Sequence, residues 1–232
     1  ISGYTTTGAS ILNDVESLPQ GILFWRSTTH WIGGMGIIVL TIAILPLLGI
    51  GGMELFAAEA PGPSADKLHP RITDTAKRLW YIYLGLTVTE AILLKLAGMG
   101  LFDAVNHAMS TLSTGGFSTK NASLAHWNHA PLIQYIVIVF MILAGTNFVL
   151  SYFAFKGKVS KVLGDEEFRV YFFNIIGIAI LVAIIVYFRA DVSKIVTDTQ
   201  LIAQPMVLGE LESALRHGLY QVTAIITTTG FV

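Results

Sequence analysis

The sequence predicts an all-α integral membrane protein built from a repeated helix–loop–helix unit. Of its 232 residues, 53% are hydrophobic and 12% are charged, whereas about a quarter of the residues in a soluble domain are charged. Several apolar stretches reach the roughly 20 residues that a helix needs to cross a bilayer. A threonine–glycine motif also occurs three times, as TTTG at 5–8, LSTGGFST at 112–119 and TTTG at 227–230.

The composition argues against several other classes of protein. The formal net charge of −1 provides no basic surface for nucleic acid. The absence of cysteine excludes disulfides and thiolate metal sites. No serine–histidine–acid grouping, phosphate loop or pair of carboxylates stands out, so we expect neither an enzyme nor an organic cofactor. The chain begins at Ile1 without a signal-peptide pattern, and we expect it to be part of a longer protein.

Four apolar stretches predict membrane-spanning helices, at 31–50, 79–98, 130–155 and 170–188. Two shorter stretches, 101–112 and 211–226, contain histidine and other polar groups, and each leads directly into a threonine–glycine motif. Their length and polarity predict re-entrant half-helices rather than spans.

Basic residues indicate the orientation. They are concentrated in the connections 51–78 and 156–169, and short loops rich in lysine and arginine face the cytoplasm. The three motifs then lie toward the outer face.

The order of spans, half-helices and motifs is an internal repeat with a period of roughly 110 residues. The repeat aligns Gly8, Gly115 and Gly230 and predicts similar units around a common axis. We divide the chain into the end of a first repeat (1–58), a cytoplasmic linker (59–78), a complete second repeat (79–157), a second linker (158–169) and the start of a third repeat (170–232).

The motifs suit a site that binds a cation through the backbone. Non-helical backbone at membrane depth must be buried in protein or line a wet cavity, where its carbonyl groups can replace the water around a cation. Glycine permits the φ values that such a strand needs, and threonine adds a hydroxyl and a stiff stem. The half-helices end near Leu112 and Ile226, so the negative ends of their dipoles would face the cavity. No motif contains a carboxylate, which favours a monovalent cation that must also leave.

Several stretches resemble the TrkH/KtrB family of bacterial potassium uptake proteins, most closely its TrkH branch. They are YTTTGASIL, FWRSTTHWIGGMGIIVL at 24–40, LLGIGGMELFAAEAPGPSADKLHPRITDTAK at 47–77, STGGFST and TTTGF. The resemblance covers essentially the whole chain.

The resemblance implies four helix–pore-loop–helix units (M1-P-M2) around a pseudo-fourfold pore axis, a site for K⁺, and a place in the bacterial inner membrane. It assigns the selectivity filter to Thr6, Thr7 and Gly8, to Ser113, Thr114 and Gly115, and to Thr228, Thr229 and Gly230. Members of the family form homodimers and are gated by a cytosolic nucleotide-binding subunit of the TrkA/KtrA type, and some depend on Na⁺. By the same resemblance, the closing span of the third unit and the whole fourth unit are missing, so we expect the 232 residues alone not to conduct.

A carrier that couples cation uptake to H⁺ or Na⁺ by alternating access remains an alternative. Such a carrier needs an ionisable relay, for which Glu90 is the candidate. Glu90 could equally make a buried contact, while Lys95 extends toward the outer surface.

The remaining polar and small residues have simpler interpretations. Gly33, Gly34 and Gly36 indicate close helix packing, Asn147 an interhelical hydrogen bond, and Arg26 an anchor at the membrane interface. His126 and His129 lack a third metal ligand and fit an aromatic interface loop, and His107 and His217 are expected to pack rather than titrate.

Overall fold

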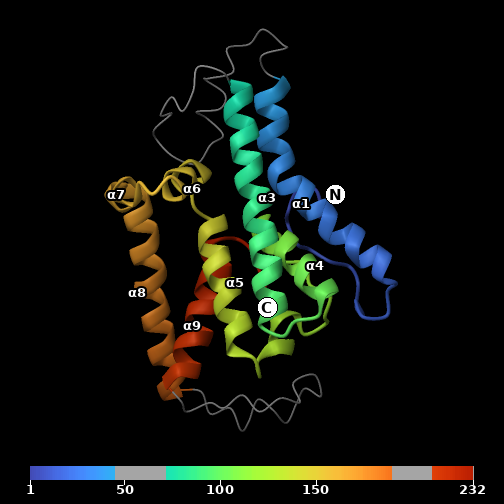
Figure 1. The fold of residues 1–232 in the computed structure, drawn as a ribbon. Helices are drawn as coiled ribbons and strands as arrows, with labels where there is room; N and C mark the ends of the chain where they lie inside the picture. The colour runs from blue at the N-terminus through green and yellow to red at the C-terminus, as the bar shows by residue number, and fades with distance from the viewer. Residues whose placement is uncertain (45–71, 190–210, 232) are drawn as a thin grey trace.

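The computed structural model describes residues 1–44, 72–189 and 211–231 (Figure 1). Within these ranges the chain forms helices and turns and no β-strand. The helices are α1 (Gln20–Ile44), α3 (Ile72–Leu96), α4 (Leu101–Leu112), the 3-10 helix η1 (Ser123–Trp127), α5 (Pro131–Ala144), α6 (Phe148–Phe155), α7 (Val159–Gly164), α8 (Glu166–Arg189) and α9 (Leu211–Ile226). The predicted all-α fold is confirmed.

The two predicted half-helices are confirmed with the predicted bounds, as α4 and α9. Gly98 adopts a φ of 103° between α3 and α4, a value that glycine takes without strain. Each half-helix has an acidic residue in its first turn, Asp103 in α4 and Glu212 in α9. These carboxylates complement the positive end of the helix dipole, so both helices begin where the charge pattern favours a helix start.

Two of the predicted spans are confirmed as the long helices α3 and α8. The segments Arg78–Leu96 and Glu166–Tyr187 are long and apolar enough to cross a membrane. Only 17% of the second segment is buried inside the structure, unlike the core helix of a soluble protein. The described part of a third predicted span, 31–50, lies in α1, which begins at Gln20 and so starts before the predicted span. Residues 45–50 lie outside the described residues.

The prediction of one continuous span over 130–155 is wrong, because the helix breaks between α5 and α6. A Cβ at Gly145 would overlap the Tyr171 hydroxyl and lie 2.9 Å from Cγ2 of Thr227, so a larger residue there would have to displace these side chains. The Tyr171 hydroxyl donates a hydrogen bond to the carbonyl of Ile142 at 3.2 Å, which satisfies one of the acceptors that a helix end leaves free. Asn147, predicted to bond between helices, lies just before α6, and its carbonyl accepts the amide of Leu150.

Helices α8 and α9 pack closely against each other (Figure 1). Small residues make the approach possible: a Cβ at Gly218 of α9 would lie 2.9 Å from the carbonyl oxygen of Ala179 and 3.2 Å from the Cβ of Ala183, both in α8. Helices in membranes associate through such small-residue contacts, so α8 holds the half-helix α9 in place.

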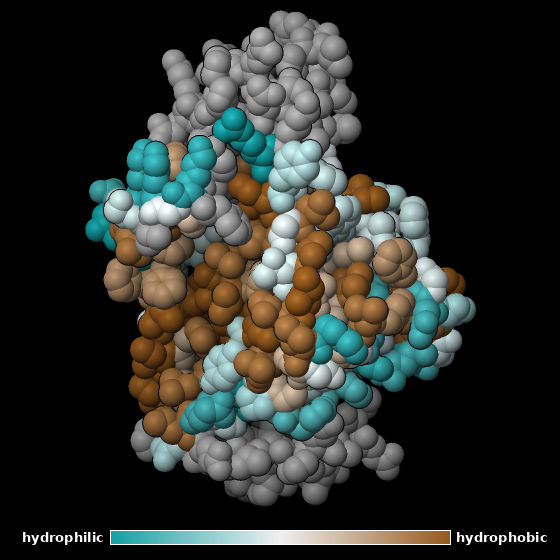
Figure 2. Space-filling model, in the orientation of Figure 1, coloured by the Kyte–Doolittle hydropathy of each residue, from teal (hydrophilic) through white to brown (hydrophobic). Residues whose placement is uncertain are grey.

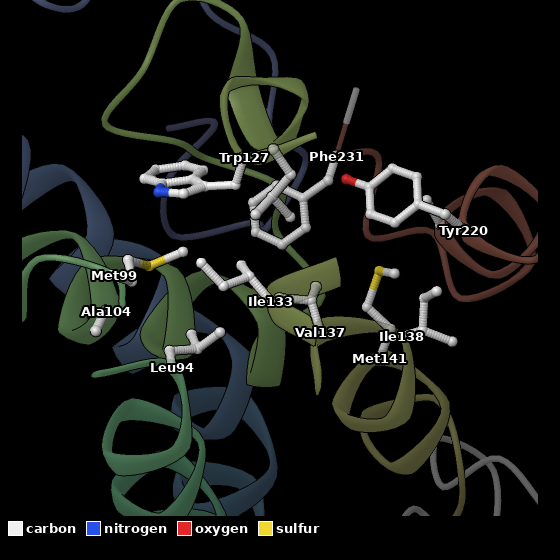
Figure 3. Packing of buried hydrophobic residues seen from close by; sticks show 12 residues of the cluster. Leu94, Met99, Ala104, Trp127, Ile133, Val137, Ile138, Met141, Tyr220 and Phe231 are labelled. Atoms are coloured by element: carbon white, nitrogen blue, oxygen red, sulfur yellow. The ribbon is translucent and has the colours of Figure 1, made fainter. Parts of the chain in front are cut away.

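The main apolar core joins elements that are far apart in sequence (Figure 3). Phe231, directly after the third motif, lies between Trp127 of η1, Ile133 of α5 and Tyr220 of α9. Because these side chains exclude water and pack at the density of a protein interior, they fix the third motif to the second unit.

On the face shown in Figure 2, apolar side chains form a band with polar side chains above and below it. Helix α8 is the clearest example, with Phe173, Leu181 and Ile184 all more than half exposed. An apolar surface of this extent is expected where a helix faces lipid.

The end of α1, the start of α3 and the helices α6 and α7 lie at the same end of the molecule (Figure 1). Exposed lysines at this end include Lys156, Lys158 and Lys161. The opposite end carries the turn between α3 and α4 and the start of α9. This arrangement agrees with the predicted orientation, in which the basic connections share one side of the membrane.

Candidate ion-binding site

The three motifs adopt the same backbone conformation. Each contains a threonine in the left-handed region followed two residues later by a glycine with positive φ. The threonines are Thr6, Thr114 and Thr228, with φ of 50°, 52° and 56°, and the glycines are Gly8, Gly116 and Gly230, with φ of 73°, 77° and 69°. A β-branched residue with positive φ is rare and costs energy, so its threefold recurrence marks a conformation that the surrounding fold imposes.

In each motif, the threonine with positive φ lies where the preceding helical turn ends. The amide of Thr114 donates to the carbonyl of Thr111 at 2.9 Å, and the amide of Gly115 donates to the carbonyl of Ser110 at 2.9 Å. These two bonds form the Schellman motif, whose left-handed position is usually glycine. Thr6 donates in the same way to Gly3 at 3.1 Å. The turn is therefore a helix cap that turns the chain back on itself.

The predicted alignment of Gly115 with Gly8 and Gly230 is wrong by one residue, since Gly116 has the matching dihedral angle. Gly115 instead corresponds to Thr7 and Thr229, and Ser113 corresponds to the first threonine of the other motifs. Alignment on the phenylalanine that follows the glycine, Phe117 in GGF and Phe231 in TGF, would have found the correct register. Adjacent glycines hid it.

The three motifs lie side by side with their backbones in contact. A Cβ at Gly8 would overlap the carbonyl oxygen of Gly115, and a Cβ at Gly116 would overlap the carbonyl oxygen of Thr229. Contact therefore runs from the first motif to the second and from the second to the third. Glycine is required at both positions for its φ and for this close approach.

Threonine hydroxyls stiffen the first and third motifs. The Oγ1 atoms of Thr5 and Thr7 are 2.8 Å apart, and those of Thr227 and Thr229 are 2.7 Å apart. The second motif has no such pair, because glycine stands at 115. The hydroxyl of Ser113 instead donates back to the α4 carbonyl of Met109 at 2.9 Å.

Helix α1 contacts two motifs at once. A side chain at Gly33 would overlap the carbonyl of Tyr4, and a Cβ at Gly34 would lie 2.7 Å from the Cβ of Ser113. The predicted packing role is confirmed for these two glycines. A Cβ at Gly36 would meet only Ile32 of its own helix, so the structure shows no packing contact for this glycine.

Phe117, directly after the two glycines of the second motif, lies between two basic side chains of α1. The His30 ring stacks on Phe117 with centroids 3.7 Å apart and an interplanar angle of 11°. The Arg26 guanidinium lies 3.8 Å from the centroid of the Phe117 ring and donates to the Ser118 carbonyl at 3.2 Å. Arg26, predicted as an interface anchor, thus contacts the second motif, and the sequence did not single out His30.

Phe231, after the third motif, contacts the second unit in a comparable way. His107 of α4 lies 5.8 Å from Phe231 and 5.0 Å from Trp127, measured between ring centroids. The two ring nitrogens of His107 are within hydrogen-bond distance of the Asp103 carbonyl, at 2.7 Å, and the Ser118 hydroxyl, at 3.0 Å. The predicted packing role of His107 is confirmed.

A buried arginine joins α9 to α5 and was also missed by the sequence interpretation. Arg216 is 6% exposed. Its guanidinium donates to the amide oxygen of Gln134 and to a carboxylate oxygen of Glu212, the latter at 3.1 Å. The Tyr135 hydroxyl donates to the same carboxylate oxygen at 2.8 Å. Burial is therefore balanced by hydrogen bonds to the charge.

The loops that follow the first and second motifs are joined by hydrogen bonds. The side-chain amide of Asn121 donates to Asp14 at 2.8 Å, and its oxygen accepts the backbone amide of Val15 at 2.7 Å. The backbone amide of Asn121 donates to Glu16 at 3.1 Å. The bond from Asn121 is the main reason that the pKa of Asp14 lies below its usual value. One asparagine thus connects two repeats.

Glu90 is fully buried in α3, which fits both of its predicted interpretations, a relay and a buried contact. Lys95 is exposed in the last turn of the same helix, as expected of a side chain that extends toward the surface. His126 packs edge-on against Trp127 at 4.8 Å, and the described residues contain no cluster of histidine and acidic groups that could hold a metal.

These features define a class: a helical membrane protein in which re-entrant half-helices end in backbone turns that meet side by side. The comparisons agree with this class. The family model described as "TrkH: Cation transport protein" matches residues 1–232. The chain belongs to the TrkH family of cation transport proteins.

Individual relatives show the same similarity. The chain is 41% identical over 232 residues to the Trk system potassium uptake protein TrkH of Salmonella typhimurium, and this match covers 99% of the chain and 44% of the relative. It is 44% identical over 184 residues to the Trk system potassium uptake protein TrkG of Escherichia coli, which covers 78% of the chain and 37% of the relative.

A solved structure matches as well. The crystal structure of the potassium transporter TrkH from Vibrio parahaemolyticus has a TM-score of 0.71 and 38% identity to the chain, and the match covers 100% of the chain and 43% of the solved one. The chain therefore spans less than half the length of the relatives that it matches.

Proposed function

We propose that the protein takes up potassium through a pore lined by backbone carbonyl groups, as the transmembrane subunit of a Trk-type system. The observation that carries the proposal is the repeated turn in which Gly8 touches Gly115 and Gly116 touches Thr229. Carbonyl groups gathered in this way can replace the hydration shell of a cation without binding it so tightly that it cannot leave. The names of the relatives, which are potassium uptake proteins, support K⁺ as the ion.

The corrected register sets the candidate K⁺ ligands. They are the residues of three equivalent strands, Thr6-Thr7-Gly8, Thr114-Gly115-Gly116 and Thr228-Thr229-Gly230. Ser113 stands one position earlier and contributes through its bond to α4. The C-terminal ends of α4 and α9 lead into these strands, and their dipoles favour a cation there.

The partners belong to the same proposal. A Trk-type system implies further subunits, and we expect a homodimer regulated by a cytosolic nucleotide-binding subunit of the TrkA/KtrA type. The exposed lysines between α6 and α7 and within α7 lie at the end that the basic connections assign to the cytoplasm. This end is where a cytosolic subunit would dock.

Reconstitution tests the proposal. The complete gene product is placed in K⁺-loaded proteoliposomes, and uptake of ⁸⁶Rb⁺ and single-channel currents are recorded with K⁺ or Na⁺ as the external cation. We expect currents that K⁺ carries better than Na⁺. Vesicles that take up no more Rb⁺ than protein-free vesicles would contradict the proposal.

A coupled carrier is the second candidate, because Glu90 is fully buried beside the pore half-helix α4. An ionisable group in such a place often marks a transport pathway. Glu90→Gln separates the candidates: a pore continues to pass K⁺, whereas a carrier that depends on this carboxyl group loses co-transport.

A further inference from the structure

The second motif differs from the others in what supports it. Its middle residue is Gly115, where the first and third motifs have Thr7 and Thr229. Those two threonines each pair their hydroxyl with a neighbouring threonine. Gly115 has no side chain to do so, and its backbone would be free to take other conformations.

His30 occupies the space that a side chain at 115 would need. A Cβ built on Gly115 would overlap the His30 ring, with its Cε1 at 2.5 Å and its Cγ at 2.6 Å. The ring belongs to α1, in the preceding repeat, and is 0% exposed. The side chain that supports the backbone at Gly115 therefore comes from another repeat.

Two further contacts fix the ring. His30 Nδ1 lies 3.2 Å from the Ser110 hydroxyl of α4, and the face of the ring stacks on Phe117. Arg26, one turn before His30, holds the far side of the Phe117 ring and the carbonyl of Ser118. His30 is thus bonded to the helix before the strand and stacked on the residue after it.

We infer that His30 is a positioning residue for ion selection: its ring holds the Gly115 segment in the conformation that discriminates K⁺ from Na⁺. The inference depends on the proposed function. A K⁺ site distinguishes ions through the spacing and number of its carbonyl groups, so a strand that loses its support discriminates less well even if it still conducts.

The experiment measures the ratio of K⁺ to Na⁺ permeability in the reconstituted complete gene product. The loss of an aromatic stack shifts the equilibrium between the supported and the unsupported conformation of the Gly115 segment by roughly two- to tenfold. We expect His30→Ala to lower the permeability ratio by about two- to tenfold. His30→Phe keeps a flat ring on Phe117 and should retain a ratio closer to that of the unchanged protein.

The matched control is His129→Ala, which removes an exposed histidine far along the chain and should leave the ratio unchanged. If His30→Ala does not accumulate, His30→Gln removes the ring and keeps a polar group near Ser110, so it gives the same test. A ratio that stays constant in either folded variant would overturn the inference. If the unchanged protein fails to prefer K⁺, the proposed function has failed instead.

Discussion

Gly116 lies so close to Thr229 that any side chain at position 116 would overlap the Thr229 carbonyl oxygen. Its φ of 77° adds a second restriction, because a non-glycine residue in the left-handed region costs about 1–2 kcal/mol. The second and third motifs, which come from different repeats, are therefore in contact only because Gly116 has no Cβ.

Gly116→Ala should lower the K⁺ to Na⁺ permeability ratio or abolish K⁺ uptake, since the second strand must move away from the third. Uptake of ⁸⁶Rb⁺ in proteoliposomes with competing Na⁺ measures the effect. Gly85→Ala is the control: no atom lies within 4 Å of its added Cβ, and alanine is favoured over glycine in a helix by about 1 kcal/mol. Equal ratios in the two variants would refute the close contact at Gly116.

Three glycines of one helix give a graded test of packing. Gly33→Ala and Gly34→Ala force α1 away from Tyr4 and Ser113, and overpacking of this kind costs about 1–3 kcal/mol. We expect both variants to unfold at a lower temperature in detergent. The Cβ of Gly36→Ala meets no other described element, so this variant should unfold at the same temperature as the unchanged protein or at a higher one. A destabilised Gly36→Ala beside a stable Gly33→Ala would reverse the assigned contacts.

Arg216→Ala should destabilise the packing of α9 against α5. The variant leaves the buried amide oxygen of Gln134 without the donor that Arg216 provides, and a buried polar group left unsatisfied costs about 1–3 kcal/mol. Thermal unfolding monitored by circular dichroism in detergent measures the loss. Arg169→Ala is the matched control because Arg169 is exposed, and surface changes usually stay within about 0.5 kcal/mol. Similar losses in both variants would show that the Arg216 bonds contribute nothing.

The connection between Asp14 and Asn121 should weaken in acid. The pKa of Asp14 is lowered in the folded protein, chiefly by the bond from Asn121. A lowered pKa means that the charged form favours the folded state, so this contribution is present above the unfolded pKa and is lost as the pH falls through the folded one. The protection of the Val15 and Glu16 amides, measured as the exchange rate of an unstructured amide at the same pH divided by the observed rate, should fall in that range. In Asp14→Asn this protection should be low at every pH, and a pH-dependent protection that survives in this variant would assign the effect to another group.

Much of the fold followed from the sequence because each element has a local cause. The bounds of α4 and α9 were predictable from short apolar runs that begin with acidic residues and end at Ser113 and Thr227. The break between α5 and α6 was not predictable from its own apolar stretch. It depends on Tyr171 of α8, whose hydroxyl donates a hydrogen bond to the free carbonyl of Ile142.

The site was predictable in its location and less so in its register and supports. Threonine and glycine marked the three turns, but GG at 115–116 left two possible alignments, which only the dihedral angles distinguish. His30 gave no signal, because its partner Ser110 lies 80 residues away in the chain and its partner Phe117 lies farther still. Contacts of this kind arise from tertiary packing alone.

Each phenylalanine that follows a motif rests on a histidine from the unit before it, Phe117 on His30 and Phe231 on His107. The repeats are therefore not independent building blocks. If they arose by duplication of an ancestral segment, a substitution in one copy altered the side chains that support the next copy. Each such substitution then required a compensating substitution in that copy. Transplanting a single repeat between relatives should fail unless the helix that supports it is transplanted too.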